Sequence, residues 1–361
     1  MKVSVLIPTY NRAYIISDAL DSVLKQTYRD FEIIIVDDGS SDGTRDVVEG
    51  FRSEKIRYLR HDLNRGCSAA YNTGISAAEG ELVAFLDSDD IWKGDYLERQ
   101  VAFFLAHPEV DVVFTDTEIQ NKSETIPSLM RFMTAFPRLL EEYPKGKEYV
   151  LSGRQMYRCL LEEVPIKPSA CLIKRGVLQR EGMFDEAWPS GTDWDLFLRL
   201  SHSACFGYFD CPLVVQRRTS DATHYLFREQ DHIFLLGVLL KEKAALGRDP
   251  EGQRAVNRGL SIHYNSLAWA YLEKGEGLEA LSIYLRGFKE TRRPLLIKKF
   301  LWGVLRIASR TVSSGRRSQK GRNVHETENC VEESPGSGLV RTEFKTERRG
   351  NSQVSLKPSK R

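Results

Sequence analysis

The stretch LVAFLDSDD, residues 82–90, joins a run of apolar residues to a cluster of acids. Five apolar residues come first, and Asp87, Asp89 and Asp90 follow within four positions. Like charges a few ångströms apart raise one another's pKa and destabilise the fold unless something compensates them. The stretch therefore predicts a buried strand that ends either in a solvated turn or at a cation site.

Similar apolar runs alternate with helical patterns through the first ninety residues. The runs are Val3–Ile7, Phe31–Val36, Ile56–Leu59 and Leu82–Leu86, and helices are expected at about 13–26, 44–51 and 68–78. Strands without polar alternation, joined by helices, indicate an α/β fold with a mostly parallel sheet covered on both faces. Ligands bind such sheets at the carboxyl ends of the strands. Here three of those ends carry polar residues: PTY at 8–10, DDG at 37–39 and DSDD at 87–90.

The rest of the chain divides into three parts. A helix at 96–106 and a strand at 110–115 precede an irregular insertion at 116–165 and a strand–helix unit from Ser169. A helix opened by Asp193 and two strands, 205–209 and 213–217, complete a first domain, 1–225. Residues 226–310 are helical and contain one helix pair of the tetratricopeptide type, and 311–361 reads as a disordered basic tail.

Composition limits the function. The chain has 361 residues and a formal net charge of +2, which gives no reason to expect nucleic acid as a partner. Six cysteines without a C-x-x-C pair favour a reduced, cytoplasmic location. We expect neither a signal peptide nor a membrane span. The basic apolar segment 292–310 is either a docked terminal helix or a peripheral contact at the inner face of the cell membrane.

The acidic cluster suits a hard divalent cation. Mg²⁺ or Mn²⁺ commonly takes one or two protein carboxylates together with phosphate oxygens and water. Asp87 and Asp89 lie two residues apart, and carboxylates at this spacing can face a bound diphosphate with the metal between them. The alternative is a solvated turn in which Asp90 or Asp95 caps the next helix.

Three segments in this order resemble the family 2 glycosyltransferases of the GT-A fold. They are VSVLIPTYNR, FEIIIVDDGSSDGT and NRGCSAAYNTGISAAEGELVAFLDSDD, and the resemblance covers roughly residues 1–115. It returns at 182–200, where GMFDE and TDWDLFLRL resemble the segment that carries the family's catalytic base. The resemblance implies a GT-A nucleotide-diphospho-sugar transferase fold followed by an α-helical C-terminal region.

The resemblance also implies a role for each site residue. Tyr10 would lie against the nucleotide base, with Pro8 and Thr9 shaping its loop, and Asp38 would accept a hydrogen bond from the ring N–H of the base. Asp37 is a capping residue in the alternative interpretation of its turn. Arg65 would approach ribose or phosphate, or else lie on the surface. Asp87 would hold the ribose side, and Asp89 would ligate Mn²⁺ or Mg²⁺.

Asp193 matches the catalytic base, although the family often has Glu-Asp where this chain has Thr192-Asp193. Asp195 is the competing candidate, but it lies about 200° further round the helix, so only one of the two can face the site. His224 comes later than the family's usual His. Trp188 and Trp194 either stack on an acceptor sugar or belong to the core.

These residues imply an inverting, metal-dependent transfer from a nucleoside-diphosphate sugar, with a UDP-sugar as the expected donor. The acceptor would be a saccharide or a lipid-linked molecule in surface polysaccharide or glycolipid synthesis. The alternative is a non-catalytic sugar-nucleotide-binding or scaffold protein, which would not need Asp38, Asp87, Asp89 and Asp193 together. Two other enzyme classes fit less well. A haloacid-dehalogenase-type phosphohydrolase would have no use for Tyr10 and Asp38. A dinucleotide oxidoreductase would need G-x-G-x-x-G after the first strand, where this chain has PTYNRA.

Overall fold

The structure is a computed structural model that describes residues 1–121, 124–188, 191–218 and 229–305. Residues 1–311 form one compact unit. The expectations for the boundary at residue 225, for His224 and for the tail at 311–361 lie outside the described residues.

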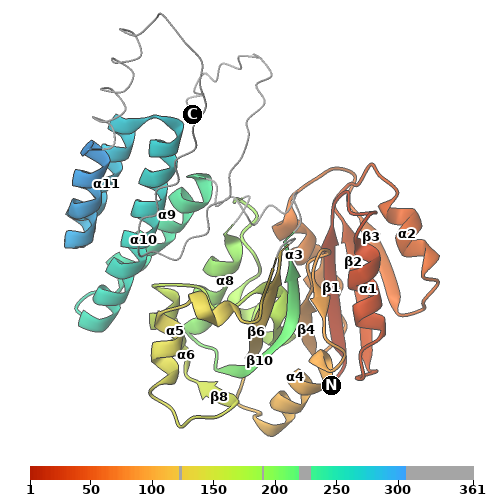
Figure 1. The fold of residues 1–361 in the computed structure, drawn as a ribbon. Helices are drawn as coiled ribbons and strands as arrows, with labels where there is room; N and C mark the ends of the chain where they lie inside the picture. Colours follow the sequence, from red (N-terminus) through yellow and green to blue (C-terminus); the bar gives the residue numbers. More distant parts are fainter. Residues whose placement is uncertain (122–123, 189–190, 219–228, 306–361) are drawn as a thin grey trace, which may run out of the picture. The chain divides into compact units, whose positions relative to one another are not determined.

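Within the described residues, one ten-stranded sheet forms the centre of this unit (Figure 1). Its order is β3-β2-β1-β4-β9-β6-β10-β5, with β7 paired to β6 and β8 paired to β10. The strands are β1 (Val3–Thr9), β2 (Phe31–Asp37), β3 (Ile56–Arg60), β4 (Leu82–Phe85), β5 (Ile91–Trp92), β6 (Val112–Gln120), β7 (Thr125–Ile126), β8 (Glu148–Leu151), β9 (Cys171–Lys174) and β10 (Phe206–Arg217). The first four strands are parallel, and β9 runs antiparallel between β4 and β6. The predicted α/β class is therefore confirmed.

Helices cover both faces of the sheet. They are α1 (Ile16–Leu24), α2 (Thr44–Gly50), α3 (Cys67–Ala77), α4 (Tyr96–Ala106), α5 (Ala135–Leu140), α6 (Gly153–Leu160), α7 (Arg175–Glu181) and α8 (Thr192–Ser201). Successive side chains of a strand point to opposite faces. Accordingly Val5 and Ile7 pack with α1 and α4 in one core, whereas Leu6 packs with α3, α7 and α8 in the other. Burial on both faces explains why these strands show no polar alternation.

Two expectations for the middle of the chain are wrong. Residues 116–165 are not an irregular insertion, because β6 extends to Gln120 and α5, β8 and α6 follow it. The two strands expected at 205–209 and 213–217 are one strand, β10, with register irregularities around Pro212. A bulge absorbs the extra residues there, so the strand continues where the sequence suggested a break.

The C-terminal part of the unit is helical, as predicted. It contains α9 (Glu229–Ala245), α10 (Pro250–Lys274) and α11 (Gly277–Thr291), and a further helix is described over residues 294–305. Tyr264, Ala268 and Tyr284 are buried where α10 and α11 pack together. This helical part shares the core that contains α6 and α8. Gly259 of α10 lies so close to α6 that an added Cβ would come within 2.1 Å of the Leu161 carbonyl oxygen.

Candidate active site

The carboxyl ends of β1 and β2 form one side of the predicted site. The Asp38 backbone N–H donates to the Thr9 carbonyl (2.8 Å), and the Asn11 backbone N–H donates to the Ser40 hydroxyl (2.8 Å). Pro8 is buried within β1, whereas Tyr10 beyond it is 46% exposed. The two loops therefore hold each other and leave the Tyr10 ring open to a ligand.

The two neighbouring aspartates of this rim have different structural roles. Asp37 is fully buried, accepts the Ser40 backbone N–H at 2.7 Å and accepts the Tyr58 hydroxyl, which makes it a turn cap. Between this cap and the next loop, Gly39 adopts a φ of +82°, and an added Cβ would lie 2.9 Å from the carbonyl carbon of Leu63. Only glycine suits both constraints.

Asp38 is held by donors from the next loop. Its Oδ1 accepts the Arg65 backbone N–H (2.9 Å) and lies 2.7 Å from His61 Nδ1, and its Oδ2 accepts the Gly66 backbone N–H (2.7 Å). His61 Nε2 in turn lies 2.9 Å from the Thr73 hydroxyl. A carboxylate oxygen has two acceptor positions, so Oδ2 retains capacity for one more donor, such as a ring N–H.

The carboxylates after β4 lie on the same edge of the sheet. Asp87 accepts the Tyr71 hydroxyl at 2.6 Å, and its own backbone N–H donates to the Ser169 hydroxyl at 3.0 Å. Asp89 is 6% exposed. The hydroxyl of Thr9 on the adjacent strand is buried and, within the described part of the chain, has no hydrogen-bond partner.

Arg217, at the end of β10, supplies positive charge to this cluster. Its Nε donates to the Asp89 backbone carbonyl (2.6 Å), its backbone N–H donates to the Asp90 carboxylate (3.3 Å), and its Nη1 pairs with Asp18 (2.5 Å). Its Nη2 is buried and has no partner among the residues described. A fixed guanidinium is therefore part of what compensates the acidic cluster.

The first turn of α8 carries both candidate bases, Asp193 and Asp195. Asp195 accepts a hydrogen bond from the Arg199 Nε at 2.8 Å, in an ion pair along the helix. Thr192 joins α8 to α3, because its hydroxyl lies 2.8 Å from that of Ser68. The geometry thus favours Asp193 over Asp195 as the residue that faces the site.

Cys67, the first residue of α3, lies amid the predicted site carboxylates. Cys67 is an exposed residue. Desolvation by the protein atoms that flank its thiol raises the pKa of that thiol well above the usual value. Four nearby negative charges raise this pKa further: Asp87, Asp193, Asp38 and Asp89. Because salt screens charges that lie more than about 10 Å apart, the four carboxylates that act on Cys67 lie near it and therefore near one another.

The segment before α8 is anchored to α3. Asn72 donates to the Phe184 carbonyl (2.9 Å) and to Glu186 (2.8 Å), and it accepts the Phe184 backbone N–H (3.0 Å). The Arg65 side chain pairs with Glu186 at 3.2 Å, and both side chains are largely exposed. Arg65 thus has a surface ion pair beside the site, which leaves its guanidinium accessible to a phosphate.

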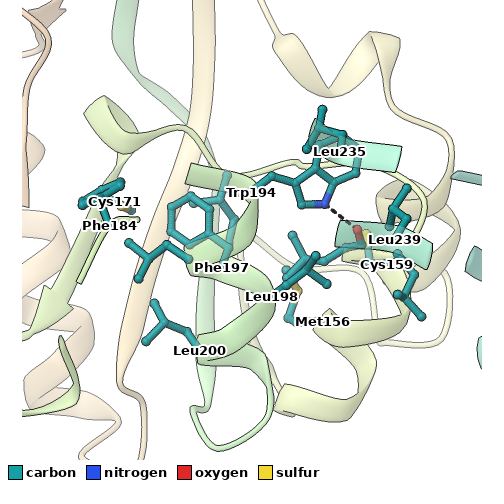
Figure 2. Close-up of a cluster of buried hydrophobic side chains, with 14 of the residues drawn as sticks. Met156, Cys159, Cys171, Phe184, Trp194, Phe197, Leu198, Leu200, Leu235 and Leu239 are labelled. Atoms are coloured by element: carbon teal, nitrogen blue, oxygen red, sulfur yellow. Dashed lines mark hydrogen bonds between the residues drawn. The ribbon is translucent and has the colours of Figure 1, made fainter. Parts of the chain in front are cut away.

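The two candidate acceptor tryptophans lie in different environments. Trp194 is 6% exposed, and its indole N–H donates to the Leu160 carbonyl at 2.6 Å (Figure 2). The structure therefore favours the core alternative for Trp194. Trp188 is 41% exposed and packs against Phe234 of α9, with ring centroids 4.5 Å apart.

Sequence reasoning missed three residues of this site: His61, Asn72 and Arg217. His61 directly follows β3, so the rule that placed Asp38 and Asp87 at strand ends would also have found it. Arg217 ends the strand expected at 213–217, so the same rule would have found it as well. Asn72 lies within a helix and carries no such signal.

Comparison with known proteins identifies the fold and then the family. The crystal structure of residues 1–349 of Staphylococcus aureus TarS in complex with UDP matches 91% of this chain and 95% of that chain, with a TM-score of 0.62 and 21% identity. The same protein in complex with UDP-GlcNAc gives a TM-score of 0.63 over 88% of this chain and 92% of that chain, at 19% identity. At these identities the match shows the shared fold, and it confirms the predicted GT-A architecture with a helical C-terminal region.

Residues 4–180 match the model of the family Glycosyl transferase family 2, and this part of the chain belongs to that family. An uncharacterized glycosyltransferase of Nostoc sp. (strain PCC 7120 / SAG 25.82 / UTEX 2576) is 42% identical over 180 residues, which cover 46% of this chain and 55% of the relative. The Escherichia coli UDP-Glc:alpha-D-GlcNAc-diphosphoundecaprenol beta-1,3-glucosyltransferase WfgD is 39% identical over 124 residues, 34% of this chain and 49% of that protein. The matched parts span about half the length of these relatives.

Proposed function

We propose that this chain transfers a sugar from a nucleoside-diphosphate sugar, with UDP as the nucleotide, to a hydroxyl of an acceptor, with inversion at the anomeric carbon. The gathering of Asp38, Asp87, Asp89 and Asp193 around Cys67 carries the proposal. Turns need one capping carboxylate, whereas four carboxylates from three separate segments suit recognition of a nucleotide sugar. A non-catalytic scaffold would have no use for this concentration of charge.

The donor would bind along the rim. Its base would lie on the exposed Tyr10 ring, with its ring N–H directed at the remaining acceptor position of Asp38. Asp87 would take the ribose side, and the Arg65 and Arg217 side chains would offset phosphate charge. Pro8 and Thr9 would shape the base-binding loop.

Mn²⁺ or Mg²⁺ is the cofactor part of the proposal. Across the described ranges no three or more His, Cys, Asp and Glu side chains gather at metal-binding distance. The carboxylates of Asp89 and Asp87 nevertheless fit a cation that takes one or two protein ligands and its other ligands from phosphate and water. When bound with the donor, such a cation would stabilise the negative charge of the departing nucleoside diphosphate.

Asp193 would act as the general base. It would accept the proton of the acceptor hydroxyl as that oxygen attacks the anomeric carbon from the face opposite the leaving group, so a single displacement inverts the stereochemistry. General-base assistance contributes a factor of about 10²–10⁴ to the rate. The exposed Trp188 is the proposed acceptor contact, and the acceptor class is a saccharide or a lipid-linked saccharide of the kind in the name of the E. coli relative.

A nucleotide-release screen tests the proposal. The full chain would be incubated with a panel of sugar nucleotides in Mn²⁺, Mg²⁺ or EDTA, beside Asp89→Ala, Asp193→Asn and Asp195→Asn. We expect one donor to show metal-dependent turnover that falls by about 10²-fold or more in Asp193→Asn while donor binding persists. Asp195→Asn is the matched control on the same helical turn and should keep turnover within a few fold.

Each opposite result has a defined meaning. Donor binding without turnover in any metal would favour the scaffold alternative. Equal losses in Asp193→Asn and Asp195→Asn would show that α8 is perturbed as a whole and would remove the assignment of the base. Turnover that persists in EDTA and in Asp89→Ala would remove the metal.

A further inference from the structure

The last described helix, residues 294–305, exposes apolar side chains on the side away from the protein. Leu296 and Gly303 form its buried side, and Gly303 lies against the side chains of Leu281 and Tyr284. The exposed side carries six large apolar residues: Leu295 (47%), Ile297 (37%), Leu301 (56%), Trp302 (43%), Val304 (39%) and Leu305 (69%). Helices on the surface of a globular protein normally show the reverse pattern, so this face needs a partner.

The charge around this helix is strongly one-sided. From Arg292 to His325 the sequence contains ten Lys and Arg and no Asp or Glu, although the whole chain has a net charge of only +2. Within the helix, Lys298 is exposed and falls on the same side as Leu301 and Leu305. Apolar and basic groups therefore share one surface.

We infer that this face, defined by Leu295, Ile297, Leu301, Val304 and Leu305 with Lys298, binds the surface of an anionic lipid bilayer. Apolar side chains on one side of such a helix enter the boundary between headgroups and acyl chains, and Lys and Arg bind the anionic headgroups. The helix would lie along the membrane. In the described part of the chain no helix is long and apolar enough to cross one.

Two other occupants fit the charge and composition less well. A second copy of the chain would bring the same basic groups, Lys298 among them, toward one another, which opposes association. The 56 residues after Leu305 contain a single aromatic residue, Phe344, and are rich in charged and small residues. They offer little apolar surface to cover this face.

Cosedimentation with vesicles tests the inference, and its readout does not depend on the proposed enzymatic activity. The full chain would be mixed with phosphatidylglycerol-containing vesicles or with purely phosphatidylcholine vesicles at low and high salt. We expect binding to the anionic vesicles, weakened by salt, and little binding to the neutral ones. Lys298→Gln should weaken binding about fivefold, the effect of one basic residue near an anionic surface.

The decisive variant is the pair Leu301→Ser and Leu305→Ser, which leaves every charge in place. It should weaken vesicle binding about tenfold or more, because two apolar side chains no longer enter the bilayer. Leu105→Ser is the matched control, since Leu105 is 66% exposed on α4 in the catalytic part of the unit. Circular dichroism and the thermal midpoint establish that each variant is folded before its binding is compared, and Lys298→Gln provides the second arm if the double variant unfolds.

Three results would overturn the inference. Unchanged binding of the folded double variant would mean that the basic sequence acts by charge alone. Equal binding to neutral vesicles would contradict the role of the basic groups. A failure to bind vesicles, with a concentration-dependent dimer that the double substitution abolishes, would assign the face to a second copy of the chain.

Discussion

Asn72 holds the segment that leads into the proposed general base, and its removal should be costly. Asn72→Ala eliminates three hydrogen bonds and leaves the backbone N–H and C=O of Phe184 without the partners they have now. Phe184 is only 6% exposed, so water replaces these partners poorly. At about 1–3 kcal/mol for each buried group left unsatisfied, we expect a loss of about 2–6 kcal/mol in the free energy of unfolding. That is a large share of the roughly 5–15 kcal/mol typical of a folded protein.

Urea unfolding, followed by far-ultraviolet circular dichroism, measures this loss. The control is Asn64→Ala, which removes an exposed Asn side chain near the same rim and should change stability by less than about 0.5 kcal/mol. A loss below about 0.5 kcal/mol for Asn72→Ala would refute the reasoning, because it would mean that the segment 182–186 is held by other contacts.

Exchanging the amide and the carboxylate between residues 72 and 186 separates the contribution of the Asn72–Glu186 hydrogen bond from that of the bonds to the Phe184 backbone. Asn72→Asp keeps an acceptor for the Phe184 N–H but places a carboxylate beside that of Glu186. Adding Glu186→Gln restores one amide and one carboxylate in exchanged positions. We expect the double variant to be more stable than Asn72→Asp alone, and the double-mutant cycle gives the coupling directly. Additive effects would show that the two side chains do not interact.

Three further predictions concern other parts of the molecule. Trp194→Phe should lower the free energy of unfolding by about 2–3 kcal/mol, because it removes a hydrogen bond and leaves a small cavity, and it should not change the KM for the acceptor. A raised acceptor KM in a variant of unchanged stability would instead indicate that Trp194 contacts the acceptor. Gly39→Ala should cost about 2 kcal/mol or more in urea unfolding, since its φ of +82° and its close neighbours both disfavour a Cβ, and a neutral substitution would contradict this turn geometry. Burial lowers the pKa of His232 to about 4. Burial, together with the nearby His232, lowers the pKa of His263 to about 3. Below pH 6.5 the unfolded chain therefore binds more protons than the folded one. Stability should therefore fall by about 1.4 kcal/mol per pH unit per histidine from pH 6.5 toward pH 4, and the variant with both changed to Gln should show a flatter profile.

The parallel half of the sheet was predictable because burial on both faces leaves a plain signal in the sequence. Continuous apolar runs located β1, β2 and β4 to within a residue or two, and the polar residues that follow them located the rim. The middle of the chain failed because prolines were taken as evidence of irregular structure. A signal for α6 was present, since Ser152 and Gln155 form a capping box at its start.

Contacts between segments distant in sequence were beyond reach. Asp193 was predicted as the base, in preference to Asp195, from its place in a motif, but a motif cannot show that the neighbouring Thr192 lies against Ser68 of α3. Likewise, a motif cannot show that Arg217, more than a hundred residues after Asp89, donates to its backbone carbonyl. Such roles depend on how the sheet brings strand ends together.

The helix α8 links the catalytic rim to the helical part of the unit. Its first turn carries Asp193, and the next residue, Trp194, points into the core beside Leu235 and Leu239 of α9 (Figure 2). The Trp194 ring also lies 5.0 Å from that of His263 on α10. Successive residues of a helix are about 100° apart, so one turn serves both purposes. The position of the base is therefore fixed on one side by the Ser68–Thr192 contact and on the other by the packing of the helical region. This arrangement gives the helical region a role in orienting the proposed base, separate from any partner that its outer surface binds.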